Sequence, residues 1–279
     1  MNGIILVKKP KGMTSFQCVS AVKRRMNERK AGHSGTLDPN AEGFMIIALG
    51  KCTKYLQFCV SNHKHYIAHF SLGKRYDTQD VWGKVVEEKD FIQHTVDELN
   101  EVSERFTGKI QQIPPMYSAI KKDGKKLYEY ARNGIEVERA AREIEVNSLS
   151  VKQLEDNLYE MDAVVSSGTY IRTLIENYCK AMNELGYMTS LVRSGIESLT
   201  LEDAVDIEEV DEKYCIDPLK VFDPKWKIVQ CEQVQDIMNG KAISLNVEEK
   251  RVILVNGKEI LAAYEKRSDG LYHCVRGLF

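Results

Sequence analysis

Apolar and polar positions follow short periods along the chain and predict a mixture of strands and helices. Apolar runs or period-two alternation indicate strands at Ile4–Val7, Phe44–Leu49, Tyr66–Leu72 and Tyr159–Ser166. Helical spacing or capping residues indicate helices from Thr14/Ser15 to about Arg29 and at Lys51–Val60, Val96–Phe106, Leu127–Arg132 and Thr169–Leu185. Because strands and helices do not alternate regularly, we expect an α+β fold rather than a doubly wound one.

The last part of the chain has a different pattern. Arg251–Val255 and Lys258–Tyr264 flank Asn256-Gly257, a pair suited to the left-handed angles of a two-residue hairpin turn. Leu271–Leu278 adds a third strand. We therefore predict a small β-rich domain at 226–279, after a main domain at 1–225.

The composition indicates a globular protein of a reducing compartment. The chain has 279 residues, of which 43% are hydrophobic and 29% charged, enough to bury a core. Its seven cysteines include no C-x-x-C pair, which argues against a disulfide framework or a zinc ribbon. The first apolar run has four residues, too few for the core of a signal peptide or for a membrane span. We therefore expect a cytoplasmic protein with no membrane partner.

Charge is distributed unevenly, although the net charge is only −2. Between Lys8 and Lys30, eight basic residues stand against one acid, Glu28. Between Glu197 and Asp223, ten acids stand against two lysines. These stretches are either solvated helix faces or a basic surface for a polyanion beside an acidic flank.

Asp38 is the candidate for a catalytic carboxylate. It lies in a loop with Gly32, Gly35 and Gly43, and Pro39 keeps it out of the helical backbone region. The glycines allow sharp turns and the close approach of a ligand. The loop therefore predicts either an acid held at a fixed angle in an open site or a surface Asp-Pro turn. A P-loop is excluded because no Gly-Lys-Ser/Thr follows.

Arg172 and Tyr66 are candidates for the same site. Arg172 lies in Ser166–Leu174, where a predicted strand passes into a helix. If it faced Asp38, its guanidinium would keep that acid ionised and oriented; otherwise it forms an ordinary surface pair. Tyr66 is either a flat platform for a nucleobase or a core aromatic.

Three histidines near Tyr66 offer a different kind of site. Alternation puts His63, His65 and His69 on one face of the predicted strand, so a three-histidine zinc site is geometrically possible. No cysteine or second carboxylate is spaced to complete it, and solvated histidines are commoner. A histidine-metal hydrolase is therefore an alternative that we do not favour, and we predict no metal.

The segment Tyr117–Arg142 combines cations with aromatic residues. They are Lys121, Lys122, Lys125, Lys126, Arg132, Arg139 and Arg142, with Tyr117, Tyr128 and Tyr130. Such a mixture suits an RNA-binding loop, where phosphates are neutralised and bases stack. The alternative is a flexible surface loop.

Taken in order, these motifs resemble the bacterial TruB family of tRNA pseudouridine synthases. The resemblance rests on Lys9–Ser15, Gly32–Pro39 with Ala41–Gly43, His65-Tyr66, Pro114–Lys121 with Lys126–Gly134, Gly168–Arg172 and Leu191–Gly195. It implies a pseudouridine-synthase fold, with a central mixed, largely antiparallel sheet flanked by helices and loops. It also implies a thumb-like insertion at about 115–142 that grips RNA. The tail at 226–279 is similar to the family's small PUA-like RNA-binding domain.

The resemblance also implies an activity. The family converts uridine 55 of the tRNA T-loop to pseudouridine by base flipping, cleavage of the glycosidic bond, rotation of the uracil and reattachment through carbon. It requires neither a metal nor an organic cofactor. The implied partner is the T-arm and elbow of tRNA, and we expect a monomer. The alternative is a tRNA-folding module that binds and releases the elbow without chemistry.

Carried over to this sequence, the family's site implies a role for each residue. Asp38 acts as nucleophile or base; whether it attacks the sugar, abstracts the ribose 2′ proton or adds to the ring stays open. Tyr66 stacks on the flipped base, and Arg172 pairs with Asp38. The remaining roles are filling the vacated space (His33), holding the base or a nearby nucleotide (Asp80), lining the pocket (Lys54, Leu191) and gripping RNA with the thumb (Lys121, Lys122, Lys125, Lys126, Arg132).

Overall fold

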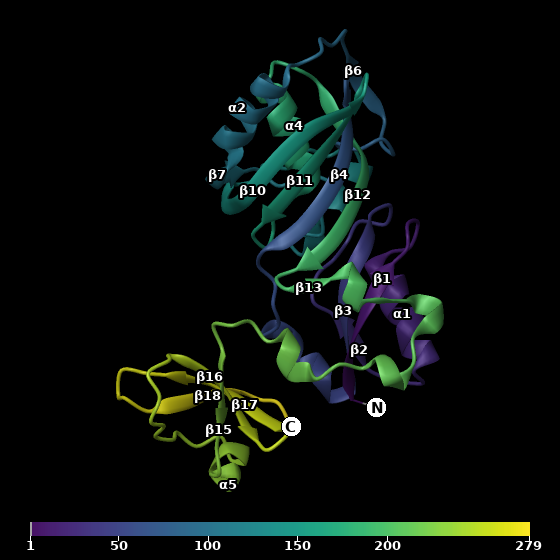
Figure 1. Cartoon of the computed structure of the whole chain (residues 1–279). Coiled ribbons are helices and arrows are strands. Elements are labelled where there is room, and N and C mark those ends of the chain that lie inside the picture. Colours follow the sequence, from purple (N-terminus) through teal and green to yellow (C-terminus); the bar gives the residue numbers. More distant parts are fainter. Residues whose placement is uncertain (1) are drawn as a thin grey trace.

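The computed structural model describes residues 2–279 and contains a large and a small β-sheet, with helices packed against the large one (Figure 1). Eight strands of the ten-stranded sheet lie side by side in the order β14 (Val205–Asp206), β1 (Gly3–Lys9), β3 (Glu42–Leu49), β12 (Gly186–Ile196), β4 (Lys64–Leu72), β11 (Leu158–Val165), β10 (Arg142–Glu155) and β7 (Gly108–Gln112). Two short strands extend it: β2 (Ala31–His33) pairs with β3, and β13 (Leu199–Thr200) pairs with β12. Within this sheet only β1–β14 and β3–β12 are parallel. The predicted α+β fold with a mixed, largely antiparallel sheet is confirmed.

One face of the large sheet packs against three helices. They are α1 (Ser15–Arg25), α2 (Val96–Phe106) and α4 (Ile171–Ala181). Because side chains alternate along a strand, every second residue of the central strands points toward these helices. The buried cluster joins Ile5, Val7, Met45, Ile47, Tyr66, Phe70 and Met161 of the strands to Cys18, Leu99 and Leu174 of the helices.

The other face of β1 and β3 packs against the end of the chain. The small sheet has the order β15 (Lys227–Gln230), β16 (Arg251–Asn256), β17 (Glu259–Lys266) and β18 (Tyr272–Gly277), with helix α5 (Val234–Met238) beside it. Ile253 and Val255 of this sheet share a buried cluster with Ile4 and Phe44 of the large one. The two sheets are therefore joined by a common apolar core.

Several predicted elements end elsewhere than expected. Helix α1 stops at Arg25, not Arg29, because Asn27 takes a left-handed backbone with φ of 46°. The segment predicted as a helix at 51–60 is a 3-10 helix, η1 (Gly50–Gln57). Helix α4 covers less than the predicted 169–185. In the hairpin, Asn256 pairs with Glu259, so the turn is Gly257-Lys258 rather than Asn256-Gly257.

The sequence reasoning missed two long strands of the large sheet, β10 and β12. Strand β10 exposes polar side chains along much of its length and contains register shifts, which obscure the alternation. Strand β12 mixes glycine, serine and a fully buried arginine with apolar residues, so it lacks a continuous apolar run. The remaining elements are the hairpins β5 (Lys74–Tyr76)–β6 (Val85–Glu88) and β8 (Lys121–Lys122)–β9 (Lys125–Lys126), helix α3 (Leu127–Arg132), and the 3-10 turns η2 (Leu201–Asp203), η3 (Ile207–Glu209), η4 (Glu212–Tyr214) and η5 (Pro218–Val221). In residues 2–279 no helix combines the length and the apolarity that crossing a membrane requires.

Gly43 allows β3 to approach β12 closely at the end of the 32–43 loop. Its φ is +115°, and a Cβ there would lie 2.3 Å from the carbonyl oxygen of Arg193. Gly12, in the neighbouring turn, also has a positive φ of +81°, but a Cβ there would meet no atom within 4 Å. Comparing a substitution at Gly43 with one at Gly12 therefore distinguishes the cost of a strained backbone from the cost of a steric clash.

We expect Gly43→Ala to destabilise the protein by about 2–5 kcal/mol, the sum of a left-handed backbone cost and an overpacking cost. Gly12→Ala should lower the free energy of unfolding only by the cost of the left-handed backbone, about 1–2 kcal/mol. Urea unfolding of both variants measures the difference. Equal losses would mean that the close approach of β3 to β12 has no energetic consequence.

Candidate active site

Lys9 holds the loop that carries Asp38 through hydrogen bonds to backbone carbonyl groups. The Lys9 side chain is 1% exposed, and its ammonium donates to the carbonyl oxygens of Pro10 at 2.9 Å, Met13 at 2.5 Å and Pro39 at 3.1 Å. Burial lowers the pKa of Lys9, and the negative charge of Asp38 acts in the opposite direction. Lys9 thus ties the turn after β1 to the residue that follows Asp38.

A second anchor holds the residue on the other side of Asp38. The Ser15 hydroxyl accepts from the Leu37 amide at 2.8 Å and donates to the Leu37 carbonyl at 3.0 Å. The Gly12 amide donates to the Pro39 carbonyl at 2.9 Å. Asp38 is therefore held between two anchored neighbours, which restricts the direction of its side chain.

Arg172 gathers acceptors from three separate segments around Asp38. It lies in the first turn of α4 and is 4% exposed. Its Nε donates to Asp38 Oδ2 at 2.9 Å, its Nη1 to the Thr78 carbonyl at 2.9 Å and its Nη2 to the Tyr117 carbonyl at 3.0 Å. The structure therefore brings Asp38 and Arg172 together, and it adds the segments at Thr78 and Tyr117 to the same contact.

Asp80 is the second carboxylate beside Arg172. Its Oδ2 lies 3.8 Å from Arg172 Nε, and its Oδ1 accepts from the Thr78 hydroxyl at 2.6 Å and the Trp82 amide at 3.2 Å. Burial raises the pKa of Asp80, while these hydrogen bonds and Arg172 lower it. Oδ1 of Asp80 is thus occupied by hydrogen bonds inside the protein, whereas Oδ2 has only the ionic contact with Arg172.

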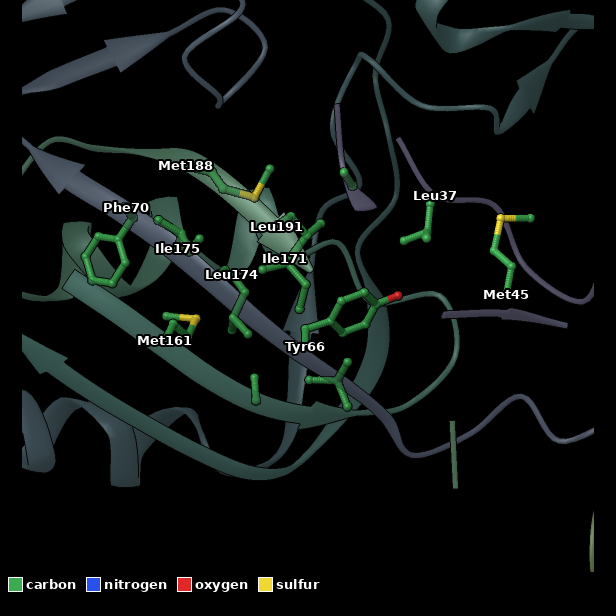
Figure 2. Close-up of a cluster of buried hydrophobic side chains, with 14 of the residues drawn as sticks. Leu37, Met45, Tyr66, Phe70, Met161, Ile171, Leu174, Ile175, Met188 and Leu191 are labelled. Atoms are coloured by element: carbon green, nitrogen blue, oxygen red, sulfur yellow. The ribbon is translucent and has the colours of Figure 1, made fainter. Parts of the chain in front are cut away.

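An apolar wall lies next to Asp38 and contains Tyr66. Tyr66, Leu191 and Ile171 are 6%, 6% and 4% exposed and belong to one buried cluster. Figure 2 shows the Tyr66 ring next to Ile171, with its hydroxyl directed toward Leu37, the neighbour of Asp38. A planar apolar surface therefore stands beside a carboxylate whose own side chain is 39% exposed.

A pair of buried cations, which the sequence reasoning did not identify, flanks the same loop. Arg193 is 0% exposed; its Nε donates to the Phe44 carbonyl at 2.8 Å and its Nη2 to the Gly35 carbonyl at 3.2 Å. Lys64 is 9% exposed, and its ammonium donates to the Ser167 hydroxyl at 3.4 Å. Burial, and next the charge of Arg193, lower the pKa of Lys64 to about 8.

His33 lies beside this pair, as part of the short strand β2. Its imidazole is largely buried, and Nδ1 has no hydrogen-bond partner among the described residues. Burial and the charge of Arg193 lower the pKa of His33. His33 therefore belongs to the rim of the Asp38 loop, on the side of Arg193.

Lys54 and the three histidines lie away from this group. The Lys54 ammonium donates to the Phe279 carbonyl and stands 5.4 Å from the Phe279 ring centroid; that Lys54 lines the pocket stays a prediction. The three histidines pair with three different carboxylates: His63 with Glu197 at 2.9 Å, His65 with Asp162 at 2.7 Å and His69 with Glu160 at 3.2 Å. Among residues 2–279 no group of three metal-ligating side chains comes together.

The thumb lysines face one another across the hairpin β8–β9. Lys121 pairs with Lys126, and Lys122 pairs with Lys125, around a turn of Asp123 and Gly124. Like charges directly opposite on a strand pair are destabilising. Lys126 Nζ and the Arg132 guanidinium lie 5.4 Å and 5.2 Å from the Tyr128 ring centroid. The hairpin is therefore a cationic, aromatic surface that a polyanion would stabilise.

Lys9, Ser15 and Arg193 stand in the quoted motifs without a role. Neither Lys64 nor Arg193 was recognised as functional from the sequence. Lys9 and Ser15 lie far from Asp38 in sequence, and only the β1–β3 pairing places them under its loop. For Lys64, the signal was its position two residues before Tyr66, on the same face of the strand. For Arg193, the signal was a charged residue within a strand otherwise buried at alternate positions.

Comparisons with known proteins bear on this arrangement. A family model described as "TruB family pseudouridylate synthase (N terminal domain)" matches residues 23–171. The tRNA pseudouridine synthase B of Mesoplasma florum is 37% identical over 281 residues, covering 99% of this chain and 98% of that protein. The protein of the same name from Alkaliphilus oremlandii is 36% identical, covering 97% of this chain and 92% of that protein.

Solved structures share the fold at lower sequence identity. A chain in the crystal structure of a Cbf5-Nop10-Gar1 complex superposes with a TM-score of 0.72 at 22% identity, covering 99% of this chain and 85% of that one. A chain of the archaeal box H/ACA sRNP Nop10-Cbf5 complex gives a TM-score of 0.70 at 20% identity. These likenesses concern the arrangement of both sheets, because they cover nearly the whole chain.

The lowered pKa of Lys64 predicts a pH-dependent difference in stability. Between its folded pKa of about 8 and its ordinary value of 10.5, the folded protein binds fewer protons than the unfolded chain, so the Lys64 contribution to stability rises with pH. Below pH 8 the buried charge is fully present and its cost is greatest. We expect Lys64→Met to be more stable than the wild type by roughly 2 kcal/mol at neutral pH.

That gain should fade as the pH approaches 10.5. Urea unfolding at several pH values measures it, and comparing the two proteins cancels the titration of other groups. A stability difference that does not change with pH would contradict the assignment.

Proposed function

The chain belongs to the TruB family of pseudouridylate synthases, and from this premise we propose that its substrate is tRNA and its target is uridine 55 of the T-loop. The reaction is an isomerisation. The N1–C1′ glycosidic bond breaks, a C5–C1′ bond forms, and the proton lost from C5 is balanced by a proton on N1. Because the formula of the nucleotide is unchanged, no oxidant, reductant or energy source is consumed.

The observation that carries the proposal is the contact of 2.9 Å between Arg172 Nε and Asp38 Oδ2 beside an apolar wall. We assign Asp38 the role of nucleophile or base and Tyr66 the role of stacking on the extruded uracil. Leu191 lines the same wall. Arg172 acts through Asp38, by fixing its direction, and is a positioning residue. Asp80, whose carboxylate lies 3.8 Å from Arg172 Nε, is assigned to hold the base or a nearby nucleotide.

Extrusion of the base has a cost that these contacts can offset. Unstacking a base from a folded loop costs a few kcal/mol, and stacking on an aromatic side chain returns about 1–3 kcal/mol. His33, on the rim of the loop, is suited to fill the space that the base vacates. A detached uracil must rotate without escaping, and the apolar wall beside Asp38 favours its retention.

The thumb at about 115–142 and the domain at 226–279 are proposed to bind the rest of the tRNA. Four lysines held opposite one another support this assignment for the thumb, because their mutual repulsion is relieved by phosphates. For 226–279, which we take as PUA-like, the support is a compact sheet packed against the main domain. We expect a monomer that acts in the cytoplasm.

The decisive variant is Asp38→Asn, which keeps the size of the side chain and removes its nucleophilicity. We expect it to abolish pseudouridine formation in a T-arm hairpin while the dissociation constant changes by no more than about threefold, because binding depends mainly on phosphate contacts. Mass spectrometry of the digested RNA detects the rearranged nucleoside, and filter binding measures affinity.

Tyr66→Phe serves as the matched control for folding and for RNA binding, since it keeps the aromatic ring that we assign to stacking. Conversion by Asp38→Asn would refute the catalytic assignment. Loss of conversion together with an equally large loss of binding would favour the tRNA-folding alternative, in which Asp38 only supports the binding surface.

The thumb predicts a specific salt dependence. Replacing Lys121 and Lys125 by Gln removes two charges from the hairpin without touching the Asp38 loop. We expect the slope of log affinity against log salt to become less steep by about 1.4–1.8, because each phosphate contact contributes about 0.7–0.9. Affinity measured over a series of KCl concentrations tests this, and an unchanged slope would place the thumb outside the RNA interface.

A further inference from the structure

Lys64 and Arg193 are two neighbouring cations without a carboxylate partner. Neither forms an ion pair with any described acid, whereas Arg172 contacts both Asp38 and Asp80. Around the Asp38 loop the buried or half-buried cations are Lys9, Lys64, Arg172 and Arg193, and the carboxylates are Asp38, Asp80 and the exposed Glu42. Lys64 and Arg193 are therefore two buried cations of this group that no carboxylate pairs with among the described residues.

The hydrogen-bonding capacity of this pair is also incompletely used. Arg193 Nη1 is buried and has no partner, and the nearby Ser34 hydroxyl and His33 Nδ1 are likewise without one among the described residues. The ammonium of Lys64 can donate three hydrogen bonds but has a single long one, to Ser167. Buried donors of this kind are normally satisfied, and an anion would satisfy several at once.

Gly35 leaves an opening beside both cations. A Cβ at this position would lie 3.5 Å from Arg193 Nη1 and 3.5 Å from Lys64 Nζ. Gly35 itself is half-exposed, whereas Arg193 Nη1 is buried, so the glycine lies between solvent and the two cations. Gly35, which has no side chain, therefore lies next to Arg193 Nη1 and the Lys64 ammonium, whose hydrogen-bonding capacity is not fully used.

The position of Lys64 relates this opening to the extruded base. Lys64 and Tyr66 are two residues apart on β4 and point to the same face, a separation of about 6.6–6.8 Å along the strand. This separation is comparable to the distance between a nucleobase and a phosphate of the same nucleotide. An anion at Gly35 would thus stand where the backbone of a nucleotide stacked on Tyr66 passes.

We propose that Lys64 and Arg193, with the open edge at Gly35, form a binding site for one backbone phosphate of the RNA, adjacent to the extruded uridine. Lys64 contacts the phosphate directly, and Arg193 contributes its charge and its free Nη1 from behind. The site fixes the sugar relative to Asp38 by holding the nucleotide at a second point. This inference rests on the proposed function, because it requires a flipped nucleotide in the pocket.

The test combines variants of Lys64 with RNAs in which one phosphate is neutral. Three T-arm hairpins are compared: an unmodified one, and two carrying a single methylphosphonate on either the 5′ or the 3′ side of the target uridine. The proteins are full-length chains that carry Asp38→Asn, so that the RNA is not converted while affinity is measured. To this parent we add Lys64→Gln, Lys64→Arg or Lys152→Gln.

Lys152 is the matched control because it belongs to the same sheet but pairs with Glu160, a partner of His69, on the opposite face from Tyr66. We expect Lys64→Gln to weaken binding of the unmodified hairpin about tenfold, the loss of one charge-assisted hydrogen bond. With one of the two methylphosphonate hairpins, Lys64→Gln should change the dissociation constant by less than about twofold. The neutral phosphate has already removed the contact with Lys64. Lys64→Arg should restore most of the affinity, and Lys152→Gln should behave as the parent.

A purely structural role for Lys64 gives a different result. In that case Lys64→Gln would weaken all three hairpins by the same factor, or none of them, and either outcome overturns the proposal. Thermal unfolding of each variant verifies that it is folded. Conversion of the unmodified hairpin by the wild-type protein is measured in parallel, so that failure of the proposed function, which removes conversion, is distinguished from failure of the phosphate site, which does not.

Discussion

The fold places one buried guanidinium where three loops and a helix meet, and the site depends on that charge being satisfied. Arg172 is almost fully buried, so each of its donors needs an acceptor, and the acceptors come from the Asp38 loop, the segment at Thr78 and the segment at Tyr117. Leaving such a charge unpaired costs several kcal/mol. The three segments therefore cannot move independently, and the direction of Asp38 is fixed by the same contacts that hold the loops.

The anchors below the loop complete this arrangement. Lys9 and Ser15 bind backbone atoms of Pro39 and Leu37 rather than Asp38 itself, so they restrict the loop without occupying the carboxylate. One oxygen of Asp38 is used by Arg172, and the side chain stays 39% exposed. The neighbours thus make the loop rigid, while part of the Asp38 carboxylate stays accessible for the role we propose for it.

Features formed by residues close together in the sequence could be predicted, whereas most features that depend on contacts between distant segments could not. Local signals identified the α+β class, the helix at 96–106 and the hairpin of the tail, and the ordered motifs identified Asp38 and Arg172 as partners. Arg193 and Lys64 were missed because their significance is the absence of a nearby acid, which depends on how β4 and β12 pair. The contact of Lys54 with Phe279 was not predicted, because it is a long-range pairing that no local pattern contains.

The position of the cations resolves the contrast between a net charge of −2 and an RNA substrate. Exposed charges are screened beyond about 8 Å in physiological salt, so the average over the molecule has little effect on a bound strand. A bound strand responds to local concentrations of positive charge, and the chain has two of them. One is the four lysines on the exposed hairpin β8–β9, and the other is the buried pair Lys64 and Arg193 beside Gly35. Under the proposed function, the exposed set gives affinity that salt weakens, whereas the buried set is screened less and fixes position. Binding and alignment are therefore assigned to different parts of the molecule.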